Sequence, residues 1–238
     1  MFAFRHTLAR VLPRWIIAPY LHIRAKLRWR RTPPEEVFTS FYKQNRWGGR
    51  DSLSGPGSDD PQTDVLVAGL PRVLRELNTS ALLDIPCGDF HWMRKVDLTG
   101  IEYTGADIVR ELIVRNSQLF GHEHIRFQHL DLMQGPLPGA DLILCRDCLV
   151  HFSYADIRRA LGVMIASGSK YLLTTTFPAR TGNTDIATGN WRPLNLQAPP
   201  FRFPTPLQFL DEGCSEGEGA YADKCLGLWK ISDLTVFR

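Results

Sequence analysis

The sequence lacks any hydrophobic run long enough to cross a bilayer. Its longest stretches without a charged residue, such as "WIIAPYLHI" at residues 15–23, are far shorter than the roughly 20 residues that a membrane-spanning helix needs. No hydrophobic core is followed by a clear cleavage site, so we expect no secretory signal. Cysteine is also scarce. Five cysteines, an odd number, favour reduced thiols over a disulfide framework, as in a cytoplasmic protein.

Acidic residues are missing from residues 1–31, which carry eight Lys or Arg. Removing these eight from the 28 basic residues leaves 20 against 25 acidic ones, a net charge of −5 for the rest of the chain. A mildly acidic body disfavours contact with a phosphate backbone, so we expect no nucleic-acid partner. The length of 238 residues suits one sizeable domain better than two.

Residues 1–31 form a basic amphipathic leader, in which apolar residues recur at helical spacing and two prolines interrupt them. Three interpretations stay open. The leader is a segment attracted to anionic lipid, at about 1 kcal/mol per basic residue; an organelle transit peptide; or a helix packed on the domain with its arginines in water. The first interpretation would bring a cytoplasmic protein into peripheral contact with the inner face of the membrane.

Residues 32–61 are predicted to be a linker and a loop rich in Gly and Ser. The sequence "PPEE" at residues 33–36 favours the first turn of a helix. The following "FYKQNRWGGRDSLSGPGSDDPQT" contains too much Gly, Ser and Asp for a regular element. Its residues 46–60, which include Trp47, are interpreted as a lid over the site. A plain connector is the alternative.

From residue 62 to residue 238, apolar strands alternate with helices. Strands are predicted over residues 80–85, 102–108, 125–132, 140–147 and 170–177, and helices over residues 61–77, 109–120 and 154–167. The first helix is expected to bury Val65, Leu66, Leu70, Val73, Leu74 and Leu77. Two late strands, residues 207–213 and 225–232, suggest an antiparallel closing hairpin. The pattern predicts an α/β, Rossmann-like domain: a seven-stranded, mostly parallel sheet with helices on both faces and an antiparallel closing strand.

Three acids stand at the carboxyl ends of predicted strands, where open α/β sheets bind their ligands. Asp84 and Asp107 close the first two strands, 23 positions apart, and Asp131 closes the third. An acid at about this distance beyond a glycine turn accepts hydrogen bonds from both ribose hydroxyls of an adenosine. The spacing therefore indicates a nucleoside site.

The stretch "LLDIPCGDF", residues 82–90, indicates which kind of nucleoside. Cys87 and Gly88 let a ligand approach the backbone closely. Asp84 and Asp89 flank this turn, where a cationic sulfonium or amino group is favoured. A dinucleotide pyrophosphate is disfavoured there, because it needs a glycine turn free of negative charge.

These motifs resemble those of the class I S-adenosylmethionine (SAM)-dependent methyltransferases. The resemblance rests on "LLDIPCGDF", "GADI", "HLDL" and "LILCRDCLVHF", in this order, and covers roughly residues 62–177. It implies SAM as the cofactor and S-adenosylhomocysteine (SAH) as the product. The strings "YKQNRWGG", "SGPGS" and "WRPLNLQAPPF" resemble a bacterial subgroup of these enzymes.

The resemblance also implies roles for single residues. It places Asp84, Cys87 and Gly88 around the methionine part of SAM and Asp107 on the ribose. Ile108 would lie against the adenine, and Asp131 and Leu132 at the adenine edge. Arg146, after the fourth strand, would lie near the cofactor and the mouth through which the substrate enters. The usual three-glycine turn keeps only Gly88, with Pro86 and Phe90 at the other two places. Trp92, just after the turn, is interpreted either as a wall of the cofactor pocket or as a core residue.

For the chemistry, His151 is the first candidate for a general base, with Asp147 beside it. A histidine that only packs and caps the next helix is the alternative. Residues 178–206, an insertion after the fifth strand, are too long for a plain loop. Trp191, Arg192 and Asn195 in this insertion, with Trp47 and Tyr221, are predicted to bind the acceptor. A packed cover over the sheet is the alternative for the insertion. The spacing in "CRDCLVH" is compatible with zinc, but buried apolar cysteines are favoured and no metal is expected.

The sequence thus predicts an enzyme that transfers a methyl group from SAM to a hydroxyl of a small molecule or a sugar. A lipid-linked glycan would suit a leader that binds the membrane. Two alternatives stay open. One is a non-catalytic binding module with the same fold, which the altered glycine turn favours. The other is an RNA or protein methyltransferase, which the acidic body disfavours.

Overall fold

The structure, a computed structural model, describes residues 32–234. The basic leader, residues 1–31, lies outside the described residues, so its three interpretations remain predictions.

The core of the molecule is a seven-stranded sheet in the order β3-β2-β1-β4-β5-β7-β6. The strands are β1 (Ala81–Asp84), β2 (Glu102–Asp107), β3 (Ile125–His129), β4 (Leu142–Cys145), β5 (Tyr171–Thr176), β6 (Gln208–Asp211) and β7 (Cys225–Lys230). The first five are parallel, and β7 runs antiparallel to both β5 and β6. The predicted mostly parallel sheet with an antiparallel closing strand is confirmed.

The order of the strands reverses between β1 and β4, which are neighbours in the sheet although β2 and β3 separate them in the chain. Such a switch point opens a crevice at the carboxyl ends of the two strands. The acid of β1 and the loop after β4 therefore meet at one edge of the sheet.

Successive side chains of the strands point to opposite faces of the sheet and pack into two apolar cores, one on each face. In β1, Leu83 packs into one core and Leu82 into the other. Helices cover both faces, as predicted. They are α2 (Pro34–Lys43), α3 (Asp64–Glu76), α4 (Arg110–Phe120) and α5 (Tyr154–Ala166). Leu66 and Leu70 of α3 lie in one core, whereas Leu112 of α4 and Ile157 of α5 lie in the other.

The buried face of α3 differs from the prediction at two positions. Leu66, Leu70, Val73 and Leu74 are buried, but Leu77, just after the helix, is only partly buried, and Val65 is 47% exposed. In a helix Val65 lies about 100° around the axis from Leu66, so it leaves the apolar stripe. It packs instead near Gly213, where a Cβ would lie 3.1 Å from a methyl group of Val65.

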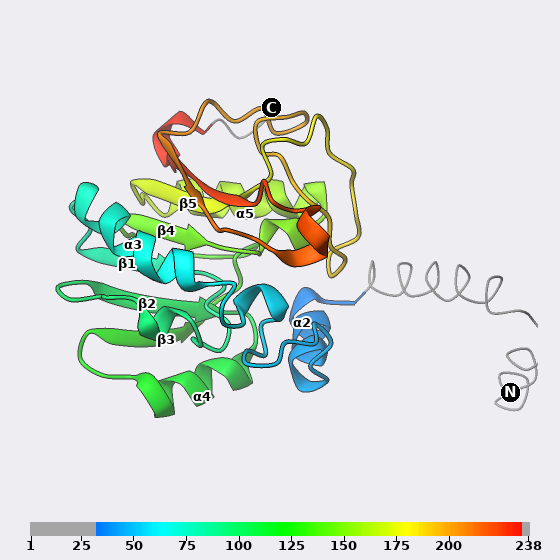
Figure 1. Cartoon of the computed structure of the whole chain (residues 1–238). Helices are drawn as coiled ribbons and strands as arrows, with labels where there is room; N and C mark the ends of the chain where they lie inside the picture. The colour runs from blue at the N-terminus through cyan, green and yellow to red at the C-terminus, as the bar shows by residue number, and fades with distance from the viewer. Residues whose placement is uncertain (1–31, 235–238) are drawn as a thin grey trace, which may run out of the picture.

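Helix α2 lies at the end of the sheet toward which the strands point (Figure 1). It starts with Pro34, Glu35 and Glu36, as the sequence predicted, and buries Val37, Phe38 and Phe41. The loop that follows, and the chain between β5 and β6, gather at the same end (Figure 1). The elements that approach the switch point are thus α2, this loop and the late segments of the chain.

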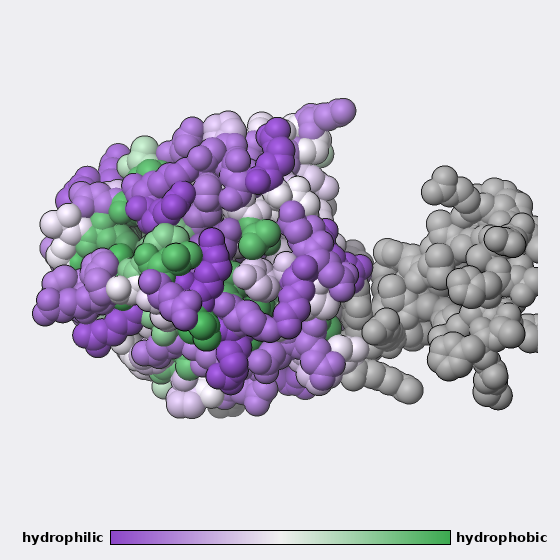
Figure 2. Space-filling model, turned by 90° about the horizontal axis from the view of Figure 1, so that it is seen from below, coloured by the Kyte–Doolittle hydropathy of each residue, from purple (hydrophilic) through white to green (hydrophobic). Residues whose placement is uncertain are grey.

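The surface on the side of α4 is mainly hydrophilic, with hydrophobic residues in separate patches (Figure 2). Val114 and Leu119 of α4 are 51% and 59% exposed. Single exposed apolar residues of this kind are ordinary and require no partner. Among residues 32–234, no helix has both the length and the apolar character that crossing a membrane requires.

Candidate active site

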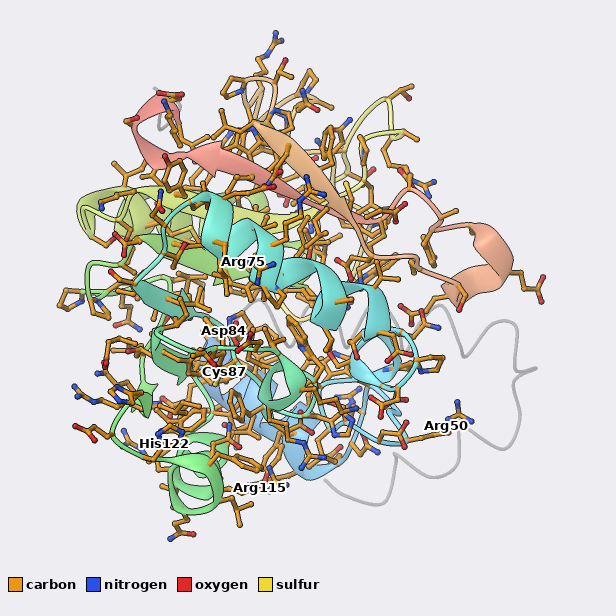
Figure 3. All side chains as sticks on the ribbon, turned by 60° about the vertical axis from the view of Figure 1, so that its left-hand side comes forward. Arg50, Arg75, Asp84, Cys87, Arg115 and His122 are labelled. Atoms are coloured by element: carbon orange, nitrogen blue, oxygen red, sulfur yellow. The ribbon has the colours of Figure 1, made fainter. Side chains whose placement is uncertain are left out.

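A cavity of about 420 Å³ opens at the switch point of the sheet. This volume lies within the usual range for small-molecule sites, about 300–1,000 Å³. Thirteen of the residues assigned from the sequence line it: Trp47, Asp84, Pro86, Cys87, Gly88, Asp89, Trp92, Asp107, Arg146, Asp147, His151, Trp191 and Tyr221. Asp84 and Cys87 lie together in the interior, whereas Arg50 lies at the periphery (Figure 3).

Two buried carboxylates mark one end of the cavity. Asp84 ends β1 and Asp107 ends β2, and they are 3% and 5% exposed. Burial raises the pKa of Asp84 to about 7, against a hydrogen bond from Tyr103 that lowers it. Burial also raises the pKa of Asp107 to about 6, against hydrogen bonds from the backbone N–H groups of Val109 and Gly88. Neither acid forms an ion pair with any of residues 32–234, so this end of the cavity suits a cation.

The turn between the two acids is held in place from both sides. The N–H of Gly88 donates to Asp107 Oδ2 at 3.1 Å, and its carbonyl accepts a bond from Asn116 Nδ2 at 2.8 Å. Asn116 is fully buried on α4. Gly88 has a φ of +54°, a conformation that glycine adopts without strain. The single glycine that the sequence keeps is therefore at one of two positions of the turn with a positive φ, and the other, at +61°, is Phe90.

The loop rich in Gly and Ser folds over this turn. Its residues 53–58 line the cavity. The carboxylate of Asp59 accepts three backbone bonds of 2.8 Å, from the N–H groups of Arg50, Asp51 and Ser52, which fix the shape of the loop. Whether the loop moves as a lid remains a prediction.

Asp89 attaches this loop to the glycine turn. Its carboxylate accepts bonds from Ser52 Oγ at 2.9 Å and from the N–H of Leu53 at 2.8 Å. Its own N–H donates to Ser54 Oγ at 3.3 Å. Asp89 lines the cavity, as predicted for a cofactor residue, but its carboxylate oxygens are used by the loop rather than left for a cation.

The contact between Gly88 and the loop makes a substitution test possible. A Cβ on Gly88 would lie 2.1 Å from Ser54 Oγ, whereas a Cβ on Gly100 would meet nothing within 4 Å. Both glycines have a positive φ, of +54° and +76°. We expect Gly100→Ala to cost about 1–2 kcal/mol of unfolding free energy from the backbone alone, and Gly88→Ala to cost more, because the Ser54 side chain must also move and lose its hydrogen bonds with Asp89. Urea denaturation measures both. Equal losses would contradict the role assigned to the contact.

Four charged side chains form a network, in which Arg146, Glu212 and Lys224 are buried and Asp147 is partly exposed. Arg146, after β4, donates to Glu212 Oε2 and to the carbonyl oxygen of Gly57, with Nη2 to oxygen distances of 2.6 and 2.7 Å. Lys224 Nζ lies 2.6 Å from Asp147 Oδ2 and 3.3 Å from Glu212 Oε2. Arg146 thus links the fourth strand, the sixth strand and the loop, which is a structural role beside the predicted one at the cofactor.

Asp147 is unsuited to take a proton at neutral pH. Burial alone would raise its pKa, but the charges of Lys224 and Arg146 outweigh burial and hold it at about 2. Asp147 therefore stays ionised and keeps a fixed negative charge in the cavity lining. Of the two predicted catalytic residues, only His151 remains a candidate base.

His151 is oriented by the insertion after β5. Its Nδ1 lies 2.9 Å from the carbonyl oxygen of Asn190. A carbonyl only accepts, so Nδ1 carries the proton and Nε2 keeps the lone pair of a base. Burial lowers the pKa of His151 below its ordinary 6.5, against raising contributions from Asn190 and Asp147. The imidazole is therefore mainly neutral at pH 7, the form that accepts a proton.

Aromatic side chains form the wall near His151. Trp191 and Tyr221 meet edge to face with ring centroids 4.9 Å apart, and Phe177 lies 6.2 Å from each of them. All three line the cavity, and Trp191 is 41% exposed. Trp47, whose ring centroid is 6.1 Å from that of His151, also lines it. The predicted acceptor residues Trp47, Trp191 and Tyr221 are thus brought together with the candidate base.

The structure gives Arg192 and Asn195 a different place from the predicted one. Neither lines the cavity. The guanidinium of Arg192 donates to the carbonyl oxygens of Leu149, Val150 and Phe152. Asn195 Nδ2 donates to the carbonyl oxygens of Pro178 and Arg180. These polar side chains satisfy backbone groups of irregular segments, which is why they are buried without contacting the cavity.

Three predicted adenine residues also lie outside the cavity lining. Leu132 is buried in the core, and Ile108 packs against the same core. Asp131 Oδ1 accepts from the N–H of Met133 at 2.8 Å, and Asp131 Oδ2 accepts from Gln134 Nε2 at 2.6 Å. Asp131 thus shapes the turn after β3. The lining does include other apolar residues, namely Phe38, Val109, Leu112, Cys148 and Phe152.

Several lining residues were not assigned from the sequence. Phe38 reaches the cavity from α2, where its place on the apolar face of an amphipathic helix was the available signal. Phe177, just after β5, and Glu216, between β6 and β7, also line it, whereas Lys224 in the lining was expected from the sequence to approach the acceptor beside Tyr221. All five cysteines are free and buried. Within residues 32–234, no three His, Cys, Asp or Glu side chains gather in a way that would hold a metal ion.

Comparison with solved structures identifies the fold. Human N-acetylserotonin methyltransferase in complex with SAM superimposes with a TM-score of 0.58 at 18% identity, over 89% of this chain and 66% of the human chain, slightly less than two thirds. The N-methyltransferase NodS from Bradyrhizobium japonicum WM9 in complex with SAH superimposes with a TM-score of 0.58 at 18% identity, over 79% of this chain and 97% of the NodS chain. The Burkholderia thailandensis 1,6-didemethyltoxoflavin-N1-methyltransferase, with 1,6-didemethyltoxoflavin and SAH bound, superimposes with a TM-score of 0.56 at 18% identity, over 84% of this chain and 90% of that chain.

The sequence itself matches no family model and no curated protein. The likeness at 18% identity establishes the fold: the chain has the fold of the class I methyltransferases, as its motifs predicted.

Proposed function

We propose that this protein transfers a methyl group from SAM to an acceptor bound in the cavity. The proposal rests on one observation above all. In a methyltransferase fold, one cavity at the switch point is lined both by Asp84 and Asp107, which have no ion-pair partner among the described residues, and by the neutral, oriented imidazole of His151. The two carboxylates suit a cationic nucleoside, and the imidazole suits the removal of a proton from a nucleophile.

The residues present fit SAM. The cofactor combines a ribose with a sulfonium and an ammonium group. Asp107 has four lone-pair sites, of which Gly88 and Val109 use two, so it retains acceptors for ribose hydroxyls. Asp84 offers a buried carboxylate without a basic partner among the described residues, which a cation would complement. A pyrophosphate would meet both acids at close range and fits poorly.

When bound, SAM supplies a methyl group that its positive sulfur already activates. The chain then has to align the nucleophile, which contributes about 7–11 kcal/mol in well-oriented systems. Trp191, Tyr221 and Trp47 would hold the acceptor against the aromatic wall. His151 Nε2 would take the proton from an attacking hydroxyl, a step worth about 10²–10⁴-fold in rate.

For the acceptor, we propose a hydroxyl of a small molecule or a sugar. The aromatic wall suits the apolar face of a sugar ring, and the charged pair of Asp147 and Lys224 offers hydrogen bonds to its polar edge. A lipid-linked glycan would be compatible with the basic sequence of residues 1–31.

Isothermal titration calorimetry of the full chain tests the cofactor. We expect SAM and SAH each to bind with one site per chain, and NAD to give no heat of binding under the same conditions. Tight binding of NAD without binding of SAM would overturn the proposal. Incubating the protein and methyl-deuterated SAM with glycan and metabolite extracts then identifies the acceptor, as the species that gains one labelled methyl group.

A further inference from the structure

A buried tyrosine stands behind the carboxylate of Asp84. Tyr103, on β2, is 1% exposed and faces β1 in the register Leu82 to Tyr103. Its hydroxyl donates to Asp84 Oδ2 at 2.7 Å. Its ring packs against Phe90, with a centroid distance of 5.2 Å, and against Phe127 at 6.0 Å. Tyr103 does not line the cavity, so it acts on the site only through Asp84.

This hydrogen bond determines how Asp84 presents its charge. The bond engages Oδ2, which leaves Oδ1 as the oxygen without a hydrogen bond to any of residues 32–234. The other groups with an electrostatic effect on Asp84 and Tyr103 come from neighbouring elements. Asp107 at the end of β2 raises the pKa of Asp84, Arg146 after β4 lowers it, and the Cys87 thiol in the glycine turn acts on Tyr103. Burial raises the pKa of the Tyr103 hydroxyl well above 10, so it remains a donor at any pH of interest.

We propose that Tyr103 is a positioning residue of the cofactor site, which holds the Asp84 carboxylate in one orientation and favours its ionised form for a cationic ligand. The inference rests on the proposed function, because it assigns Asp84 to SAM. It also has a part that needs no ligand. Without the hydroxyl, burial and the charge of Asp107 act on Asp84 with less to oppose them, so the carboxyl should become protonated at a higher pH.

Tyr103→Phe is the appropriate variant, since it keeps the ring contacts and removes only the hydroxyl. SAM binding by the wild type and the variant is measured by calorimetry between about pH 6 and pH 9. We expect the ratio of the two dissociation constants to be about 10–100 near pH 7, the effect of one hydrogen bond to a charged group. The ratio should fall as the pH rises, because Asp84 of the variant then becomes ionised as well. Titration of the amino group of SAM is common to both proteins and cancels in the ratio.

A second measurement uses the ligand-free protein. The carbon-13 shift of the Asp84 carboxyl, assigned with Asp84→Asn, is followed against pH in both proteins. We expect a pKa of about 7 in the wild type and a higher value in Tyr103→Phe. Tyr171→Phe on β5, a tyrosine that does not line the cavity, is the matched control and should change neither readout.

The outcomes separate the two proposals. The role of Tyr103 would be overturned if the titration of Asp84 were unchanged in Tyr103→Phe and the ratio of the two dissociation constants were constant with pH or close to one throughout. SAM binding by the wild type would in that case still support the proposed function. No SAM binding by the wild type would overturn both roles at the cofactor site. If the titration of Asp84 in Tyr103→Phe were shifted in that case, the Tyr103 hydroxyl would control the charge of Asp84 for the binding of a ligand other than SAM.

Discussion

Replacing Asp107 by alanine is expected to weaken the binding of SAM at least about a hundredfold. The carboxylate is the proposed acceptor for both ribose hydroxyls, and a hydrogen bond to a charged group contributes about 1.5–3 kcal/mol. Two such bonds correspond to a factor of a hundred or more in the dissociation constant. Calorimetry with SAM and SAH measures the effect, and it should be similar for both ligands, because they share the ribose.

The control for this variant must account for the structural bonds of Asp107. Its Oδ2 accepts from the N–H of Gly88 at 3.1 Å, and its Oδ1 accepts from the N–H of Val109, two residues further on, at 2.9 Å. Asp97 Oδ1 accepts from the N–H of Thr99 with the same spacing, at 3.1 Å, but is exposed and outside the cavity lining. Asp97→Ala should therefore lose a comparable backbone contact and bind SAM as the wild type does. Asp107→Asn, which keeps one carbonyl oxygen, should give an intermediate loss.

Equal affinity of Asp107→Ala and the wild type would contradict the ribose assignment, even if SAM bound tightly. If Asp107→Ala lost both SAM binding and its cooperative thermal unfolding, Asp107→Asn would decide, because the amide retains the shape of the side chain.

The acids of this site were predictable because a short-range pattern encodes them. The apolar run that ends on Asp84, and the more mixed strand sequence that ends on Asp107, predict parallel strands, and the carboxyl ends of such strands meet at one edge of the sheet. Asp131 followed the same pattern, yet its carboxylate folds back onto Met133 and Gln134. The pattern places an acid at the sheet edge but does not determine what the side chain bonds to.

The charged network was not predictable, because its partners are far apart in the chain. Arg146 and Glu212 are 66 positions apart, and Asp147 and Lys224 are 77 apart. Periodicity describes one element at a time and says nothing about such pairs. The same reason explains why Arg192 and Asn195 lie outside the cavity lining. In an irregular segment, whether a polar side chain faces a cavity or satisfies a backbone carbonyl depends on packing that no local signal records.

Replacing His151 by glutamine is expected to lower the rate of methyl transfer by about 10²–10⁴-fold and to leave the affinity for SAM nearly unchanged. Glutamine preserves polarity and approximate size but does not accept a proton at neutral pH. The rate is measured with the extract fraction that gains a labelled methyl group, and the affinity by calorimetry. A matched control is His122→Gln, since His122 is exposed and does not line the cavity.

The pH dependence gives this prediction a second readout. Burial lowers the pKa of His151 below 6.5, and only the neutral imidazole accepts a proton, so the wild-type rate should rise as the pH passes through that pKa and level off near pH 7. This rising limb should be absent from His151→Gln. A variant that kept both the rate and the limb would assign proton removal to another group or to none. Asp147, with a pKa of about 2, is already ionised across this range, so it contributes no limb of its own and the two residues are distinguishable in one profile.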